Sequence, residues 1–354
     1  MSTWNFALVG CGKIAQKHAF AIGTYLPNAQ VVAVCDIDAG KARALAETAG
    51  AEAYSSITEM MDARADDIDI VSVLTPSGRH AENATELVPY EKPLVVEKPL
   101  ALRLDEADHM LRLCDSHGVK LFVVHQNRYN APIMKAREAL RTGRLGRPVL
   151  GTVRVRWKRD QSYYDSAAWR GTWAYDGGVF ANQASHHIDM LSWFMGQPVS
   201  VKAVASTSLV NIECEDTGAA LVRYDEGGIG IIEATTAARP KDLEGSISIL
   251  GEHGSVVVGG FFMEQLLTWE FQTPLPEDEK VFEQFGQNPD GWGYNLGEYL
   301  KGAITALETN RSGLVDGLEG RKSLELISAI YESIETGEEV SIRFSPRRCR
   351  LGLR

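Results

Sequence analysis

Cysteine is scarce in this sequence of 354 residues, and no two cysteines form a close pair. The five that occur, Cys11, Cys35, Cys114, Cys214 and Cys349, are scattered and odd in number. This spacing provides neither a disulfide framework nor a zinc knuckle, and it is typical of proteins in a reducing compartment. We therefore expect a cytoplasmic protein whose fold does not depend on disulfide bonds.

Long apolar runs and an excess of positive charge are also missing. No stretch approaches the roughly 20 apolar residues that cross a bilayer, and the opening MSTWNFALVG lacks the pattern of a signal peptide. The formal net charge is -11, whereas binding to nucleic-acid phosphates requires clustered lysine and arginine. We expect neither a membrane nor a nucleic acid as a partner.

The first third of the chain alternates short apolar runs with helical patterns. Residues 5–9 are apolar and lead directly into GCGKIA, residues 10–15. In this G-x-G-x-x-A turn the first glycine allows a tight bend, and the second lets a pyrophosphate approach the backbone at a helix N-terminus. A glycine-rich turn in an α/β domain that binds no nucleotide is the alternative interpretation.

The acidic residue Asp36 favours a nucleotide site. It directly follows a second apolar run, residues 31–35. An acid at this place accepts hydrogen bonds from the adenine ribose and repels a 2′-phosphate, and no arginine follows that would hold such a phosphate. The pattern predicts a Rossmann-type domain that binds NAD, with contacts from Gly10, Gly12, Lys13, Ile14 and Asp36.

Three further apolar runs have the composition of strands buried in a parallel sheet, at residues 69–74, 94–96 and 121–124. Polar residues follow each of them, in the sequences TPS, EKP and HQNR. Ligands of open α/β sheets bind at the carboxyl ends of the strands. The residues that we expect to contact the cofactor there are Thr75, Ser77, His80, Glu97, Lys98 and Asn127.

After about residue 126 the pattern changes to strands that alternate between apolar and polar residues. The clearest, at 148–158, places Arg154, Arg156 and Lys158 on one face. This basic stripe either binds an anionic substrate or forms a solvated or interfacial face. Further strands are expected at 200–207, 218–224, 228–236, 244–250 and 255–259, and a polar loop at 274–290.

This order of elements predicts two domains. We place an α/β Rossmann-type domain at residues 1–125, and an α+β domain with a large, mostly antiparallel open sheet at residues 126–354. Helices can cover one face of such a sheet, and we expect a neighbouring subunit on the other face. The protein is therefore predicted to be an oligomer.

The stretch DGGVFANQASHHIDMLSWF, residues 176–194, places two histidines beside an aspartate. A helical pattern from Ser185 puts His186 and Asp189 at i, i+3 positions, where they can interact. Neighbouring histidines on a helix diverge by about 100°, so His186 and His187 make a poor chelate and no metal site is predicted. A structural histidine at a helix start is the alternative to a general base. The base fits better, because a nicotinamide enzyme that oxidises an alcohol must also remove the hydroxyl proton.

Taken together, these motifs resemble the glucose–fructose oxidoreductase/inositol dehydrogenase (Gfo/Idh/MocA) family. The matching segments are GCGKIA, EKP and the Gly-Gly…His-x-x-Asp segment, and the similarity runs over most of the chain. QNRYN (126–130), YYDSAAWRGTW (163–173) and residues 176–191 are further similar to the UDP-N-acetylglucosaminuronate 3-dehydrogenases of bacterial surface-polysaccharide synthesis. The resemblance implies an NAD-dependent sugar-nucleotide dehydrogenase that forms a homotetramer.

The resemblance also implies catalytic roles for two residues. Lys98 would lie by the nicotinamide and the reacting hydroxyl, where neighbouring positive charge lowers its pKa, and His186 would share the proton transfer. Many family members have an aspartate four residues before this histidine, whereas the residue here is Asn182. Because asparagine cannot take a proton, Lys98 and His186 would manage the proton between them.

Further ligand contacts follow from the same resemblance. Trp169 and Arg170 are expected at the cofactor, together with the strand-end residues above. Arginine binds a carboxylate or a diphosphate with its planar fork, which makes the arginines of these motifs candidates for the anionic groups of the substrate. The expected substrate contacts are Lys98, Arg159, Tyr163, Tyr164, Arg170, Asn182, Gln183, Ser185 and His186.

The activity that we expect is oxidation of C3 of UDP-2-acetamido-2-deoxy-glucuronate to the 3-keto sugar. The product would feed an aminotransferase on the way to a diacetamido-uronic acid. Some members of this subgroup keep their nicotinamide bound and reoxidise it with 2-oxoglutarate, which the sequence leaves open. Two alternatives remain: a dehydrogenase of a free polyol or sugar on the same fold, and a non-catalytic NAD-binding regulator. A regulator has no need of both Lys98 and His186.

Overall fold

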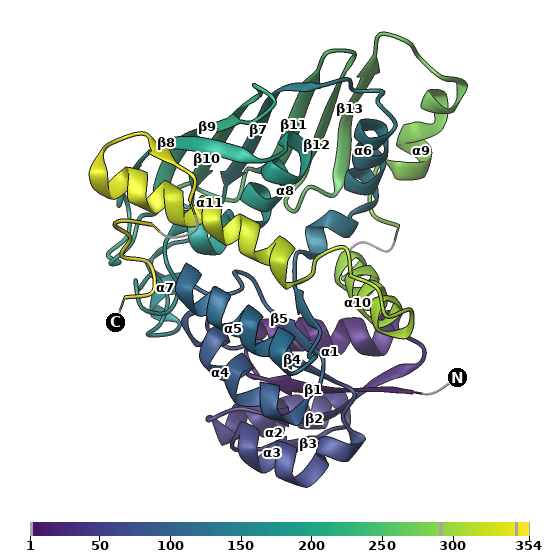
Figure 1. The fold of residues 1–354 in the computed structure, drawn as a ribbon, viewed down its shortest axis with the longest axis vertical. Helices are drawn as coiled ribbons and strands as arrows, with labels where there is room; N and C mark the ends of the chain where they lie inside the picture. Colours follow the sequence, from purple (N-terminus) through teal and green to yellow (C-terminus); the bar gives the residue numbers. More distant parts are fainter. Residues whose placement is uncertain (1–2, 290–292, 344–345, 354) are drawn as a thin grey trace. The chain divides into compact units, whose positions relative to one another are not determined.

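The computed structural model describes residues 3–289, 293–343 and 346–353. They form two compact units, each with its own sheet (Figure 1). Unit 1 comprises residues 1–101, 105–126 and 292–321, and unit 2 comprises residues 102–104, 127–291 and 322–354. Within the described residues, no helix has both the length and the apolar character needed to cross a membrane.

Unit 1 is built on a 6-stranded parallel sheet in the order β3-β2-β1-β4-β5-β6. This is the strand order of dinucleotide-binding domains, so the predicted Rossmann-type fold is confirmed. The strands are β1 Trp4–Val9, β2 Ala29–Cys35, β3 Glu52–Tyr54, β4 Ile70–Val73, β5 Leu94–Val96 and β6 Leu121–Val123. The helices are α1 Lys13–Tyr25, α2 Ala39–Ala49, α3 Ile57–Arg64, α4 His80–Leu87, α5 Leu104–Ser116 and α10 Tyr294–Glu308.

The segment 293–321 belongs to unit 1, although the division expected from the sequence assigned it to the second domain. Its helix α10 packs against α1. A Cβ at Gly297 of α10 would lie 2.6 Å from Cβ of Tyr25, so the missing side chain allows this close approach. The apolar residues of α10, including Leu296, Tyr299 and Leu300, are buried. The sequence does not predict this assignment, because the pattern of an amphipathic helix does not indicate which of the two sheets the helix covers.

Unit 2 is built on an 8-stranded sheet in the order β13-β12-β11-β7-β10-β9-β8-β14. Among the strand pairs of this sheet that the structure describes, only β7–β10 is parallel, which confirms the mostly antiparallel open sheet. The strands are β7 Pro148–Arg156, β8 Pro198–Ser206, β9 Thr217–Tyr224, β10 Ile229–Thr235, β11 Glu244–Gly251, β12 Gly254–Gly259, β13 Gln265–Phe271 and β14 Val340–Ser341. The helices are α6 Ala131–Arg141, α7 Gln161–Asp165, α8 Ser185–Met195, α9 Val281–Phe285 and α11 Gly317–Thr336, the last of which begins in unit 1.

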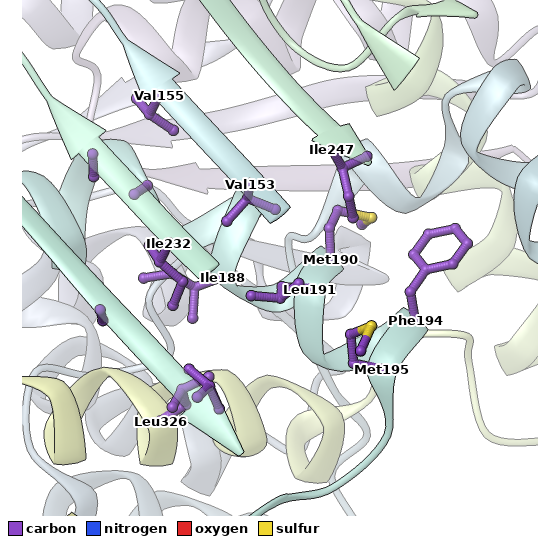
Figure 2. Packing of buried hydrophobic residues seen from close by; sticks show 14 of the residues in the cluster. Val153, Val155, Ile188, Met190, Leu191, Phe194, Met195, Ile232, Ile247 and Leu326 are labelled. Atoms are coloured by element: carbon purple, nitrogen blue, oxygen red, sulfur yellow. The ribbon is translucent and has the colours of Figure 1, made fainter. Parts of the chain in front are cut away.

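Helices α8 and α11 lie on one side of this sheet (Figure 1). Figure 2 shows Ile188 and Leu191 of α8 directed toward Val153 of β7 and Ile232 of β10. A Cβ at Gly151 would lie 2.6 Å from Sδ of Met195, so this glycine lets α8 approach β7 closely. The helix that carries the two histidines is therefore fixed against the centre of the sheet.

The basic stripe of β7 lies on the opposite face and is paired with acids of the two neighbouring strands. The guanidinium of Arg156 lies 2.6 Å from Oε1 of Glu233 and 3.3 Å from Oε2 of Glu244, and Arg154 faces the same two acids at 3.8 and 3.6 Å. These contacts favour the solvated or interfacial interpretation over an anion site.

In the predicted loop 274–290, the structure forms a short 3-10 turn, Pro276–Lys280, followed by α9; residue 290 lies outside the described residues.

Candidate functional site

The turn after β1 has the form of a phosphate-binding loop. Gly10 has a φ of 92°, and a Cβ there would lie 2.9 Å from the backbone nitrogen of Thr75, so the fold requires glycine. At Gly12, by contrast, a Cβ would meet no atom of the described residues within 4 Å. No side chain caps α1, whose first residue is Lys13. The start of α1 therefore offers exposed amides to an anion, as NAD pyrophosphate requires.

These two glycines give a matched prediction. Gly12→Ala should leave the melting temperature unchanged but weaken NAD binding at least about tenfold, because its methyl group occupies space that only the ligand needs. Gly10→Ala should lower the melting temperature, at a cost of about 1–3 kcal/mol, because it combines positive φ with a backbone clash. Thermal unfolding and NADH-binding fluorescence separate the two effects. Wild-type affinity in Gly12→Ala would exclude this turn as the pyrophosphate site.

Asp36 is positioned by the glycine turn itself. Its Oδ2 accepts the amide of Cys11 and its Oδ1 accepts the amide of Asp38, both at 2.8 Å. The carboxylate predicted to bind the ribose is thus already oriented before a ligand arrives. The next residue, Ile37, is 99% exposed and offers an apolar surface beside this carboxylate, a feature that the sequence reasoning did not use.

His80 connects the loops that follow β4 and β5. Its side chain is buried, with Nδ1 2.8 Å from the carbonyl oxygen of Pro99 and Nε2 2.9 Å from that of Thr75. Burial lowers the pKa of His80, although these carbonyls oppose the shift. Because both nitrogens face backbone carbonyls, the ring joins the two loops, and its expected contact with the cofactor stays a prediction.

Glu97 is likewise engaged within unit 1. Its Oε1 lies 3.1 Å from Nε2 of His18 on α1, and its Oε2 accepts the amide of Lys98 at 3.1 Å. Burial raises the pKa of Glu97, but His18 and Lys98 outweigh this effect, and the net shift is downward. The anionic carboxylate holds the backbone at Lys98, which is only partly buried at the end of β5. His18 was missed in the sequence because nothing in its spacing indicates a partner so distant in the chain.

In unit 2, the two histidines lie near the start of α8, which follows the π-helix Val179–Gln183. His186 is 8% exposed, whereas His187 is fully buried, with its ring 5.7 Å from that of Trp157. Within the described residues, no group of three His, Cys, Asp or Glu side chains is arranged to hold a metal ion.

The aspartate of this helix forms a buried ion pair. Asp189 Oδ2 accepts Nε of Arg128 at 2.9 Å, and Oδ1 accepts Nη2 at 2.7 Å, with both side chains no more than 3% exposed. The sequence places Asp189 where it can interact with His186, and in the structure its carboxylate binds the arginine of QNRYN in this bidentate pair. Arg128 thereby connects α8 to the segment Gln126–Tyr129, which carries Asn127.

Several of the expected substrate residues form one hydrogen-bonded row. Nη1 of Arg170 donates to the hydroxyl of Tyr163 at 2.6 Å, and Nε2 of Gln183 reaches the same hydroxyl at 3.1 Å. Nε2 of Gln183 also lies 3.1 Å from Oδ1 of Asn182, whose amide nitrogen donates to Asp176. The row therefore brings together residues of two separate motifs, 163–173 and 176–191. The buried Asp176 was not singled out from the sequence.

Positive charge collects at the Tyr163 end of this row. The guanidinium carbon of Arg170 lies 4.3 Å from the Tyr163 ring centre, and that of Arg159 lies 5.3 Å away. Arg159 also pairs with Asp242 at 3.2 Å, whereas no salt bridge of the described residues includes Arg170. Arg170 additionally stacks on Trp169 at 4.4 Å. The arrangement suits an anionic group bound next to Tyr163.

Tyr164 does not face this row. Tyr164 is 7% exposed and its hydroxyl is 3.0 Å from Oγ1 of Thr236, so the structure places it in the core of unit 2, and its expected substrate contact stays a prediction. Ser185 is also buried, and its hydroxyl donates to the carbonyl of Asn182 at 3.2 Å.

The remaining residues expected at the cofactor are divided between the two units. Ile14, Thr75 and Ser77 are partly buried in unit 1, and Asn127, Trp169 and Arg170 belong to unit 2.

The fold and the glycine turn define an NAD-binding oxidoreductase. Residues 4–125 match the oxidoreductase family with an NAD-binding Rossmann fold, and residues 133–257 match the GFO/IDH/MocA C-terminal domain. The chain belongs to the Gfo/Idh/MocA family of NAD-dependent dehydrogenases, and NAD is its cofactor.

Two solved structures resemble the chain over nearly its full length. The WlbA dehydrogenase from Bordetella pertussis, in complex with NADH and UDP-GlcNAcA, is 39% identical, covers 97% of this chain and 98% of its own, and has a TM-score of 0.92. The WlbA dehydrogenase from Chromobacterium violaceum, with the same two ligands, is 40% identical, covers 97% of each chain and has a TM-score of 0.89. The myo-inositol dehydrogenase Hyg17 from Streptomyces leeuwenhoekii is 30% identical over 259 residues, which are 72% of this chain and 76% of that protein.

Proposed function

We propose that the protein oxidises the C3 hydroxyl of UDP-2-acetamido-2-deoxy-glucuronate (UDP-GlcNAcA) to the 3-keto sugar. The observation that carries the proposal is the row from Arg170 through Tyr163 and Gln183 to Asn182, which offers a cation at one end and amide groups at the other. Such a row suits a ligand that combines anionic groups with sugar hydroxyls. The similarity to the two WlbA dehydrogenases supports the same substrate.

The chemistry divides between the cofactor and the chain. NAD supplies the hydride acceptor for C3 when it is bound. The hydroxyl proton must leave to the protein, and we propose that Lys98 and His186 take it between them. Asn182 cannot accept a proton, so it binds a hydroxyl instead. The Glu97 carboxylate and the His80 ring keep the backbone on either side of Lys98 in place.

Arg170 and Arg159 are proposed to bind the uronate carboxylate or the diphosphate. A bidentate guanidinium contact with either group is charge-assisted and directional.

The same proposal includes a cytoplasmic role in bacterial surface-polysaccharide synthesis, where the 3-keto product is a substrate for an aminotransferase. The proposal includes a second half-reaction, in which 2-oxoglutarate reoxidises the nicotinamide while it stays bound. The dehydrogenation does not depend on this step.

The test adds UDP-GlcNAcA to the purified protein and follows the near-ultraviolet absorbance of reduced nicotinamide, with and without 2-oxoglutarate. A rise on adding the sugar nucleotide, bleached by the keto acid, supports both half-reactions. A rise that requires added NAD and does not respond to 2-oxoglutarate supports the dehydrogenase and removes the recycling step. Absence of any rise, in protein shown to bind NADH, contradicts the proposed substrate.

A free polyol is the second candidate substrate, because the relatives include inositol dehydrogenases such as Hyg17. If the UDP group contributes binding energy through Arg159 and Arg170, free N-acetylglucosaminuronate and myo-inositol should be poor substrates. Equal or better turnover of myo-inositol would favour this second candidate. A non-catalytic NAD-binding regulator would show no turnover with any of these compounds.

We also propose that a second copy of the chain covers the open face of the unit 2 sheet, in a homotetramer. Apolar side chains lie exposed on strands of this sheet, among them Val204, Leu221 and Ile229, which are 65%, 56% and 47% exposed. The charged residues of the same face are already paired across the strands. A surface that is apolar and internally neutralised fits another copy of itself.

Leu221→Lys should therefore dissociate the oligomer, because it places an unpaired charge opposite Ile231 on the neighbouring strand. The measurement is the molar mass from light scattering coupled to size-exclusion chromatography. Leu318→Lys is the matched control, since Leu318 is also exposed (64%) but lies in unit 1. A monomeric wild-type protein, or an unchanged mass in Leu221→Lys, would contradict the proposed interface.

A further inference from the structure

Two side chains from distant parts of unit 2 hold the start of the π-helix Val179–Gln183. The hydroxyl of Tyr331, on α11, accepts two amides of this region at 3.1 and 3.4 Å. Glu215, which precedes β9, accepts one amide with Oε1 at 3.1 Å and another with its backbone carbonyl at 3.0 Å. The four amides are consecutive and belong to Gly178, Val179, Phe180 and Ala181.

The carboxyl and the phenol form one buried unit beneath this turn. The hydroxyl of Tyr331 donates to Oε1 of Glu215 at 2.8 Å, and the two residues are 1% and 6% exposed. A Cβ at Gly178 would lie 2.2 Å from the carboxyl carbon of Glu215, so glycine is required by the close approach of this carboxyl. The turn above them carries Asn182 and Gln183, which belong to the proposed substrate row.

Glu215 is a buried carboxyl to which the described residues offer no counter-charge. No salt bridge of the described residues includes it, and within the same residues its Oε2 is buried without a hydrogen-bond partner. The titratable groups that face it are Asp176, Tyr331 and the adjacent Cys214. Burial, reinforced by Asp176, raises the pKa of Glu215 to about 7, although the amide of Phe180 and the Tyr331 hydroxyl oppose the shift. The pKa values of Tyr331 and Cys214 are also raised by burial, so both groups stay protonated at neutral pH.

We propose that Glu215 and Tyr331 are positioning residues for substrate binding, and that the proton on Glu215 keeps the turn in its binding form. Loss of this proton leaves a buried negative charge that repels Asp176. Because Asp176 accepts the side-chain amide of Asn182, its displacement moves the substrate row. The inference rests on the proposed function only for the identity of the substrate.

The first test measures KM for UDP-GlcNAcA between about pH 6 and about pH 8.5, a window that spans the titration of Glu215. In the wild type, KM should rise by about tenfold as the carboxyl loses its proton, which corresponds to one or two lost hydrogen bonds. Glu215→Gln keeps the Oε1 acceptor but cannot ionise, so its KM should not rise. Glu226→Gln, at the exposed β9–β10 turn, is the matched control and should show the wild-type rise. A flat wild-type KM, or a rise that persists in Glu215→Gln, overturns the proposal.

Tyr331→Phe tests the second residue at about pH 6, where Glu215 is protonated. Removing the hydroxyl leaves two amides of the turn without their acceptor, and KM should rise about tenfold while NADH binding is unchanged. Tyr224→Phe, which removes another buried tyrosine hydroxyl from unit 2, is the control for a general loss of packing. Equal KM values in the two variants would contradict a positioning role for Tyr331.

A second measurement needs no substrate. Between the ordinary carboxyl pKa of 4.5 and about 7, the folded protein holds a proton on Glu215 that the unfolded chain has released. The stabilisation of the folded state by protonated Glu215 is therefore fully present below the ordinary carboxyl pKa of 4.5. It is lost as the pH rises through about 7. The melting temperature of the wild type should fall across this window relative to Glu215→Gln. If UDP-GlcNAcA is not oxidised but this difference is present, only the proposed function fails. If the pH slopes of the two proteins coincide, the protonation of Glu215 is refuted.

Discussion

Replacing Lys98 with alanine is expected to lower kcat by roughly 10²- to 10⁴-fold while NADH still binds, because proton transfer by a positioned side chain contributes about that factor. His186→Ala should produce a loss in the same range. The measurements are steady-state turnover of UDP-GlcNAcA and NADH-binding fluorescence on the same preparations. Loss of turnover with retained cofactor affinity separates the chemical step from assembly of the nucleotide site.

Lys92→Ala is the matched control for Lys98→Ala, because Lys92 precedes the same strand β5 at its other end. It removes a lysine from the same unit without touching the EKP loop, and its kcat should equal that of the wild type. Turnover close to wild type in Lys98→Ala would remove this residue from the chemistry. The same result in His186→Ala would leave Lys98 as the single proton acceptor.

Arg128→Met is expected to destabilise the folded protein by about 3–5 kcal/mol, because it leaves the buried carboxylate of Asp189 without its partner. Both side chains of this pair are almost fully buried, so solvent cannot replace the lost contacts. The free energy of unfolding from denaturant titration measures the effect. Since Asp189 lies on α8, the variant should also reduce turnover through the position of His186.

The double variant Arg128→Met/Asp189→Leu provides the decisive comparison. It removes both charges, so it should recover much of the stability that Arg128→Met loses. Arg223→Met is the surface control, because Arg223 and Glu339 form an exposed pair whose loss should be hardly measurable. A small loss in Arg128→Met, or a double variant less stable than the single one, would contradict the assignment of a buried structural ion pair.

The nucleotide site could be predicted from the sequence because its determinants are local. The turn GCGKIA joins one strand to one helix, and Asp36 ends the adjacent parallel strand, so the order of the strands alone brings them together. The alternation in β7 likewise predicted which of its residues share a face of the sheet. In these cases the period of the pattern and the position of a turn contain all the necessary information.

The proposed substrate row could be predicted only in part. Tyr163 and Tyr164 are neighbours, yet one joins the row and the other packs into the core, which depends on the backbone of α7. Glu215 and Tyr331 lie far apart in the sequence and meet only because α11 packs against the start of the π-helix. The side chain that fills a buried position next to a turn is decided by tertiary packing, and no spacing rule reveals it.

The central claim is that hydride leaves C3 of the sugar, and isotopic labelling tests it most directly. UDP-GlcNAcA carrying deuterium at C3 is incubated with the protein and NAD, and the nicotinamide is analysed by mass spectrometry. The proposed reaction predicts that deuterium from C3 is recovered on the reduced nicotinamide, and that Lys98→Ala and His186→Ala transfer it far more slowly. Reduced nicotinamide without deuterium would show that another position of the sugar is oxidised, and no reduced nicotinamide would contradict the dehydrogenation of this sugar nucleotide.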